Sequence, residues 1–185
     1  SERAYTALFL SHNQIGDQGV KDLSKGIQNN KTIQHLILTN NKLTDFAMAA
    51  LADMLKVNHH IGWLVLNKNA IGKRGMEELG KCLPENKGIK HAVLSENQAG
   101  DEGLKGLAEG LTKNNTLESL FLRDNHISSD GITYLTEALS KTKSLNRIDI
   151  RDNPEISQPA IDSLDRIAKE KGVRLYQDRG VLASA

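Results

Sequence analysis

The sequence contains a single cysteine, Cys82, and no excess of charge, since 24 Lys and Arg residues against 23 Asp and Glu residues give a formal net charge of +1. One cysteine excludes an intramolecular disulfide and is typical of a reducing compartment. The absence of a basic excess argues against a dominant role on nucleic acid or on a membrane surface. No stretch approaches the ~20 apolar residues of a membrane span, and no apolar run follows a basic start. We therefore expect a cytoplasmic, intracellular-type protein, with export into a host cell by a non-classical route left open.

Sequence signatures of catalysis are also lacking. No Ser/His/Asp or Cys/His arrangement stands out in the chain. The segment Gly72-Lys73-Arg74-Gly75 has no Gly five residues before Gly72 and no Ser or Thr after Lys73, so it does not match a phosphate-binding loop. We predict that the chain is not an enzyme and uses no cofactor.

A repeat of 28 residues organises what is present. The phrase Leu-Phe-Leu-Arg-Asp-Asn at 120–125 recurs along the chain, and its last residue keeps one spacing throughout. The positions are Asn13, Asn41, Asn69, Asn97, Asn125 and Asn153. A constant period in this range is typical of a solenoid, in which each unit buries its apolar face only against its neighbours.

Each unit predicts a short strand followed by a helix. Leu120 and Leu122 alternate with more outward positions, which is the pattern of a half-buried strand. After the asparagine comes a polar turn with a residue suited to start a helix, namely Asp17, Asp45, Asp101 or Ser129. Apolar residues at spacings of three and four then mark one buried helical face, on which Cys82 is expected to be a small core residue. A small residue begins this face in five units and indicates close approach of stacked helices: Gly19, Ala47, Gly75, Gly103 and Gly131.

The combination of Leu-x-Leu-x-x-Asn-x-Leu, a 28-residue unit and a full helix resembles the leucine-rich repeat family, specifically its ribonuclease-inhibitor-like class, over about residues 5–175. The resemblance implies an α/β fold, a right-handed solenoid that forms a curved arc with a parallel sheet on the concave face and helices on the convex face. It also implies that the six asparagines form a structural ladder, bonding backbone groups of adjacent coils. Other turn asparagines, such as Asn114, are expected at the surface.

We predict a single leucine-rich-repeat domain over residues 1–185, with six repeats at about 8–172, a last strand at 173–176 and a loose tail at 177–185. Tyr5 stands where later units carry Ile or Leu, so the chain begins in mid-unit without the polar cap of repeat arrays. This predicts a fragment of a longer protein or an exposed first edge. Ala92 and Ala99 replace larger residues and predict a less filled core in the fourth unit.

The histidines do not predict a metal site. His35 and His91 share one strand position two repeats apart. Because adjacent strands lie about 4.8 Å apart, this separation is roughly 10 Å. That is too far for one zinc ion with bonds of about 2 Å.

Side chains that alternate outward from the strands are the candidate binding residues. Five neighbouring strands place an apolar residue at the central outward position: Phe9, Ile37, Val65, Val93 and Phe121. Strand propensity alone favours such residues, but a contiguous apolar surface beside the only tryptophan is more typical of a partner site. Arg123, Arg147 and Arg151 form a basic end that favours an acidic partner edge. The predicted partner-binding set is His35, Ile37, Trp63, Val65, His91, Val93, Phe121, Arg123, Arg147 and Arg151.

The resemblance implies a protein–protein interaction module that binds another protein on its concave face, as an effector, inhibitor or sensor domain. From the charge balance we expect neither nucleic acid nor a membrane as partner, and we predict a monomer. An alternative from a different class is a regulator of a small GTPase like the Ran GTPase-activating proteins, which share this repeat and act with loop residues. The absence of a long acidic tail in the 185 residues makes that the poorer match. A panel of small GTPases assayed for phosphate release separates the two. A third possibility is a structural spacer, which predicts no ligand on the concave face.

Overall fold

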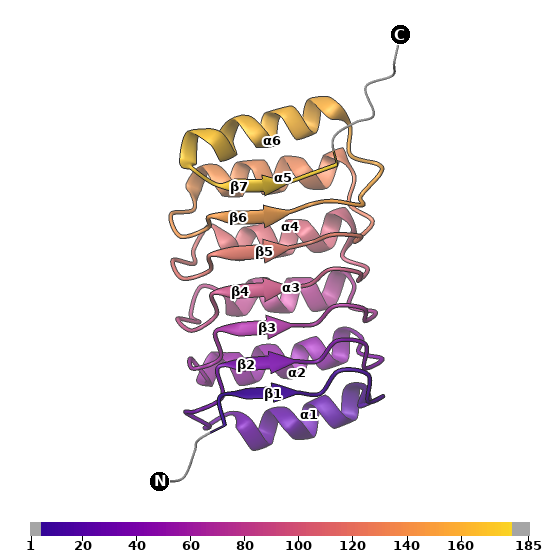
Figure 1. Cartoon of the computed structure of the whole chain (residues 1–185), viewed down its shortest axis with the longest axis vertical. Coiled ribbons are helices and arrows are strands. Elements are labelled where there is room, and N and C mark those ends of the chain that lie inside the picture. Colours follow the sequence, from indigo (N-terminus) through magenta and orange to yellow (C-terminus); the bar gives the residue numbers. More distant parts are fainter. Residues whose placement is uncertain (1–4, 179–185) are drawn as a thin grey trace.

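The computed structural model describes residues 5–178, in which seven strands alternate with six helices (Figure 1). The elements in chain order are β1 (Ala7–Phe9), α1 (Gly16–Ile27), β2 (His35–Ile37), α2 (Asp45–Val57), β3 (Trp63–Val65), α3 (Lys73–Cys82), β4 (His91–Val93), α4 (Gly100–Leu111), β5 (Ser119–Phe121), α5 (Ser129–Lys141), β6 (Arg147–Asp149), α6 (Gln158–Lys171) and β7 (Arg174–Tyr176). The tail predicted for 177–185 lies outside the described residues from residue 179 onward.

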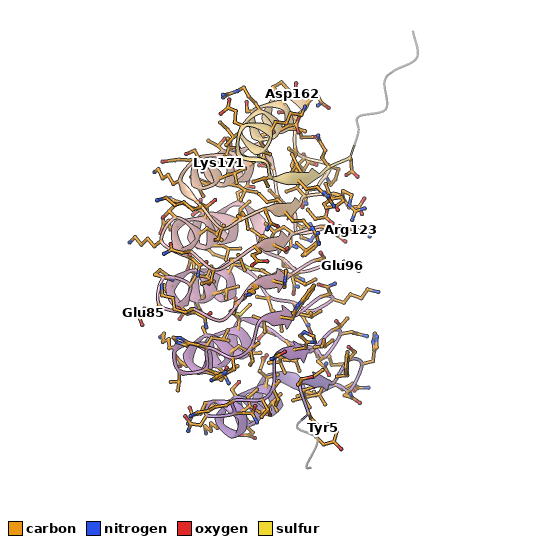
Figure 2. The ribbon with its side chains drawn as sticks, turned by 60° about the vertical axis from the view of Figure 1, so that its left-hand side comes forward. Tyr5, Glu85, Glu96, Arg123, Asp162 and Lys171 are labelled. Atoms are coloured by element: carbon orange, nitrogen blue, oxygen red, sulfur yellow. The ribbon has the colours of Figure 1, made fainter. Side chains whose placement is uncertain are left out.

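The strands form one parallel sheet in the order β1 to β7. All the helices lie on one side of this sheet, as predicted for the solenoid (Figures 1 and 2). From β1 to β6 every pair of facing residues is 28 positions apart, for example Leu36 and Leu64. Equivalent residues therefore stack in straight rows across the sheet. Inward residues such as Leu36, Leu64 and Leu66 are fully buried against the helices. Period-two alternation along each strand thus decides which row faces the core and which faces outward.

Small residues allow the helices to stack closely. A methyl group added at Gly131 would overlap Asp101 of the preceding helix, whereas at Gly19 it would meet only Ile15 of its own unit. The tightest approach was not predicted from the sequence and joins α3 to α4, where a methyl group on Gly110 would overlap the backbone of Gly80. Large side chains at this crossing would push the two helices apart.

The fourth unit places its small residues in the core. Ala92 and Ala99 are both buried. They belong to the unit whose helix, α4, makes that close approach to α3. Smaller core side chains and a shorter distance between helices thus occur together in this part of the solenoid.

The acidic residues predicted to begin helices have a different role. Asp17, Asp45 and Asp101 lie in the first turn of their own helices and make no cap there. Each carboxylate instead accepts hydrogen bonds at the start of the next unit's helix. Asp45 Oδ1 accepts from the backbone N–H groups of Gly72 (2.6 Å) and Gly75 (3.0 Å). Asp17 accepts from the backbone N–H and the hydroxyl of Thr44, and Asp101 accepts from the same two groups of Ser128. These bonds satisfy N–H groups that an isolated helix leaves without partners.

A row of asparagines, here called the strand-end ladder, lies where each strand ends. Asn41 Oδ1 accepts from the backbone N–H groups of Asn13 (3.0 Å) and Ile15 (3.2 Å) in the preceding unit. Its Nδ2 donates to the carbonyls of Leu10 (2.8 Å) and Thr39 (3.2 Å). Asn69, Asn97, Asn125 and Asn153 also reach into the preceding unit with both atoms. The bonds of the Asn13 side chain stay within its own turn among the described residues.

The turn around each ladder asparagine contains a residue in the left-handed region, which non-glycine residues seldom adopt. These residues precede the asparagines with φ values between 50° and 61°: His12, Asn40, Lys68, Glu96, Asp124 and Asp152. Such a turn is retained where hydrogen bonds hold it in place. The strand-end ladder supplies those bonds.

A second row of asparagines, here called the helix-end ladder, lies where the first four helices lead into the next strand: Asn30, Asn58, Asn86 and Asn114. Asn86 Nδ2 donates to the carbonyls of Leu55 (2.8 Å) and Asn58 (3.2 Å), while its Oδ1 accepts from the N–H groups of Gly88 and Ile89. Asn58 and Asn114 make equivalent bonds. The expectation that Asn114 is a surface residue is therefore wrong, because this side chain is buried and bonded to the preceding unit.

Candidate functional site

The central outward row of the sheet forms an apolar stripe, defined by Phe9, Ile37, Val65, Val93 and Phe121. These residues are facing partners on neighbouring strands, so they lie side by side across β1 to β5. Phe9 is 73% exposed, and the other four are half-buried against one another and their neighbours. The next residue in the row is Asp149, which ends the stripe on β6.

Trp63 lies beside the stripe, between two histidines of the adjoining strands. Its ring centroid is 3.9 Å from that of His91, with the planes tilted by 30°, and 5.9 Å from that of His35 in an edge-on arrangement. Burial lowers the pKa of His91, which favours the uncharged imidazole at neutral pH. Trp63 is still 37% exposed. The cluster therefore offers a packed aromatic surface.

Charged residues occupy the other end of the concave face, and most of them are paired. Arg151 forms a bidentate ion pair with Asp149, with distances of 3.0 Å and 2.7 Å, although the Asp149 side chain is almost fully buried. Arg123 pairs with Asp152 and lies on the strand side of the molecule in Figure 2. Arg147 makes no ion pair with any residue in the range 5–178. The free positive charge at the predicted basic end is therefore smaller than the three arginines suggest.

The helix side of the molecule carries shallow hollows between neighbouring helices. One of about 490 Å³ lies over Gly80, Gly106 and Gly110, between α3 and α4, and is bordered by Lys and Glu side chains. A second of about 480 Å³ lies between α1 and α2 beside Phe46. Alternating Lys and Glu side chains around the first hollow are typical of a solvated surface. We therefore place the candidate site on the concave face.

Groups with chemical reactivity are few and remote from one another. Burial raises the pKa of the Cys82 thiol to about 12, so it stays protonated at neutral pH and is a poor nucleophile. Between residues 5 and 178 there is no group of three or more His, Cys, Asp or Glu side chains able to hold a metal ion. His35 and His91 are separated by the ring of Trp63. In the described part of the chain, none of the helices combines the length and hydrophobicity needed to cross a membrane.

One exposed aromatic residue was missed from the sequence. Phe46 lies on α2, faces away from the sheet and is 79% exposed. The positions one repeat away in either direction are Gln18 and Arg74, so comparing residues by column would have found an apolar residue in a polar row. Phe46 provides an aromatic side chain on the face opposite the stripe.

Comparison with known proteins agrees with this geometry. A family model described as "Leucine Rich repeat" matches residues 6–24, 29–52 and 113–135. Each matched stretch is thus similar to a leucine-rich repeat. A solved structure described as leiomodin-1 actin-binding site 2 is similar over 81% of this chain and 87% of its own, with 15% sequence identity and a TM-score of 0.71. A second, the yeast complex of Rad7 and Elc1, covers 92% of this chain and 54% of its own, with 14% identity and a TM-score of 0.40. A comparison with curated protein sequences gives no match.

The likeness to the leiomodin-1 structure supports the solenoid fold, and at 15% identity it carries no information about particular residues. Leucine-rich-repeat domains generally mediate protein–protein interaction, so a binding role is the general function that the repeat supports.

Proposed function

We propose that this chain is a recognition module that binds a partner protein on its concave face. The observation that carries the proposal is the apolar stripe, which crosses five neighbouring strands beside Trp63. Contiguous exposed apolar surface on a folded protein usually marks an interaction site. Aromatic side chains contribute strongly to binding, because they bury a large area at a small cost in conformational entropy.

The sheet also suits this role mechanically. Backbone hydrogen bonds join each strand to the next, and the two asparagine ladders hold the turns at both ends. A partner that contacts the stripe therefore does not have to order the backbone beneath it. A surface that is already ordered lowers the entropic cost of association.

The repeat length and the full helix in each unit support assignment to the ribonuclease-inhibitor-like class. The likeness to an actin-binding site of leiomodin-1 supports a protein as the kind of partner, and the fold alone does not identify it. We further propose action in a reducing, cytoplasmic compartment, as an effector, inhibitor or sensor domain. The buried Cys82 thiol is consistent with such a compartment.

The test is capture of a partner from native and candidate host lysates, identification by mass spectrometry, and measurement of its affinity for variants. Trp63→Ala and Phe121→Ala are each expected to weaken binding by ~2 kcal/mol or more, about 30-fold in Kd. Neither should greatly lower the melting temperature, because both side chains point away from the core.

The matched control is Phe46→Ala, which removes an equally large aromatic side chain from the helix side. Lys81→Ala is a second control on that side, where the side chain is largely exposed. Both are expected to leave the affinity unchanged. If the helix-side changes abolish capture while the concave ones do nothing, the binding surface lies on the helices and the proposal fails.

A further inference from the structure

The apolar stripe has a defined length and direction. Its five residues are facing partners from β1 to β5, so the stripe runs across the strands, along the axis of the solenoid. Adjacent strands lie about 4.8 Å apart, and four such steps span about 19 Å. A ligand that follows the stripe must therefore offer an apolar group about every 5 Å over that length.

An α-helix meets this requirement, and an extended peptide does not. Residues three or four apart on a helix lie on one face and are separated by about 4.5–6 Å along the axis. In an extended peptide, residues on one face are about 6.6–6.8 Å apart, so they fall out of step with the strands after one or two contacts. At about 1.5 Å per residue, a helix of roughly 13 residues covers the stripe.

The charges around the stripe distinguish its two ends. Over the first four strands the rows on both sides contain no Asp, Glu, Lys or Arg. One row is Ser11, Thr39, Asn67 and Ser95, and the other is Ala7, His35, Trp63 and His91. At the β6 end, Arg147 faces Arg174 on β7. Neither arginine makes an ion pair with a residue in the range 5–178. Hydrogen bonding to Arg174 lowers the pKa of Tyr176. Within these rows of residues 5–178, arginines without an ion-pair partner thus lie at the β6 end and not beside β1 to β4.

From this geometry we propose that the partner presents an amphipathic α-helix of about four turns, which lies along the apolar stripe with a carboxylate-bearing end over Arg147 and Arg174. This inference rests on the proposed function. The helix contacts the stripe with apolar residues at spacings of three and four, and one of them packs on the exposed edge of Trp63. Carboxylates at one end pair with the two arginines and set its direction, as charge complementarity does at other interfaces.

The experiment selects ligands for the purified protein from two displayed libraries. One randomises one face of a single helix held on a small helical scaffold, and the other contains linear peptides of equal length with prolines that prevent a helix. We expect binders from the helical library with apolar residues at spacings of three and four over at least ten residues, and with acidic residues at one end. Binders from the linear library alone, or no helical binder, overturn the inference.

Variants then test position and direction. For the selected helix, Trp63→Ala and Val93→Asp are each expected to raise Kd at least tenfold, while Phe46→Ala leaves it unchanged. The double change Arg147→Glu and Arg174→Glu should also weaken binding, and replacing the acidic end of the peptide by lysines should restore it. Helical binders that ignore the stripe variants, or charge reversal without restoration, contradict the inference.

The two levels of proposal fail in different ways. If Trp63→Ala abolishes capture of the natural partner but no helix is selected, concave-face binding stands and the helical ligand is wrong. If the natural partner binds equally well to Trp63→Ala and Phe121→Ala, the proposed function is wrong, whatever the libraries return. Circular dichroism and melting of each variant, compared with the parent, show that the fold is retained.

Discussion

The two asparagine ladders lie at opposite ends of the first four units, and they use the polar atoms of the asparagine side chain differently. In the strand-end ladder, both polar atoms cross to the preceding unit: Asn41 accepts from the N–H of Asn13 and donates to the carbonyl of Leu10. In the helix-end ladder, only the amide N–H₂ crosses. Asn86 donates to Leu55 of the preceding unit, while its Oδ1 accepts from the N–H groups of its own turn.

The difference follows from the backbone groups that each end leaves unpaired. A helix leaves its last carbonyls without partners, and Asn86 and Asn114 donate to such carbonyls, those of Leu55 and Leu83. The turn after each strand, with its left-handed residue, instead leaves N–H groups that need an acceptor, such as those of Asn41 and Leu43, which bind Asn69. The same residue type serves both ends because an amide carries a donor and an acceptor.

The largest expected effect comes from breaking the core between the two ladders. Leu66→Asp buries an unpaired carboxylate among apolar side chains, which costs several kcal/mol. Helical content should collapse across the array, because the units are stable only together. Circular dichroism and thermal melting measure this. The control is Val65→Asp, because the neighbouring Val65 side chain points outward and this variant should retain the fold. Equal melting temperatures of the two variants would show that the strand register is wrong.

Removing one asparagine from each ladder compares them directly. Asn97→Ala and Asn86→Ala are each expected to lower the free energy of unfolding by roughly 1–3 kcal/mol, because buried backbone groups lose their partners. Urea denaturation followed by circular dichroism gives both values. The control is Asn115→Ala, at an exposed turn position, which should have a negligible effect. A negligible effect at Asn86 as well would limit the stabilising role to the strand-end ladder.

A gain of stability is expected where the helix-end ladder stops. The fifth unit has Thr142 in the position of the asparagine, and its hydroxyl reaches only Leu139 of its own helix. Thr142→Asn should donate to the carbonyls of Leu111 and Asn114, by analogy with Asn58, and raise stability by roughly 0.5–1.5 kcal/mol. The measurement is the same urea denaturation. Unchanged or lower stability would show that the end of the fifth unit is stacked on the fourth differently from the earlier units.

The strand-end ladder and the stripe could be located from the sequence because both follow directly from period. A constant 28-residue repeat places equivalent residues in one row, and alternation along a strand separates the inward Leu66 from the outward Val65. The helix-end ladder has the same period, at Asn30, Asn58, Asn86 and Asn114. It was not predicted, because a turn asparagine is ordinarily a surface residue, and Asn114 was therefore expected at the surface.

Pairing between units could not be obtained from the sequence. The local sequence pattern predicts the row in which a side chain lies. It does not predict the hydrogen-bond or ion-pair partner in the neighbouring coil, because that partner depends on how the coils stack. Thus Asp45, which was expected to start its own helix, caps the next one, and Arg151 is neutralised by the buried Asp149. The sequence by itself determined the repeat, the strand register and the apolar stripe. Only the tertiary structure decided which charges remain free, because ion pairing depends on distances of a few ångströms between side chains from different coils.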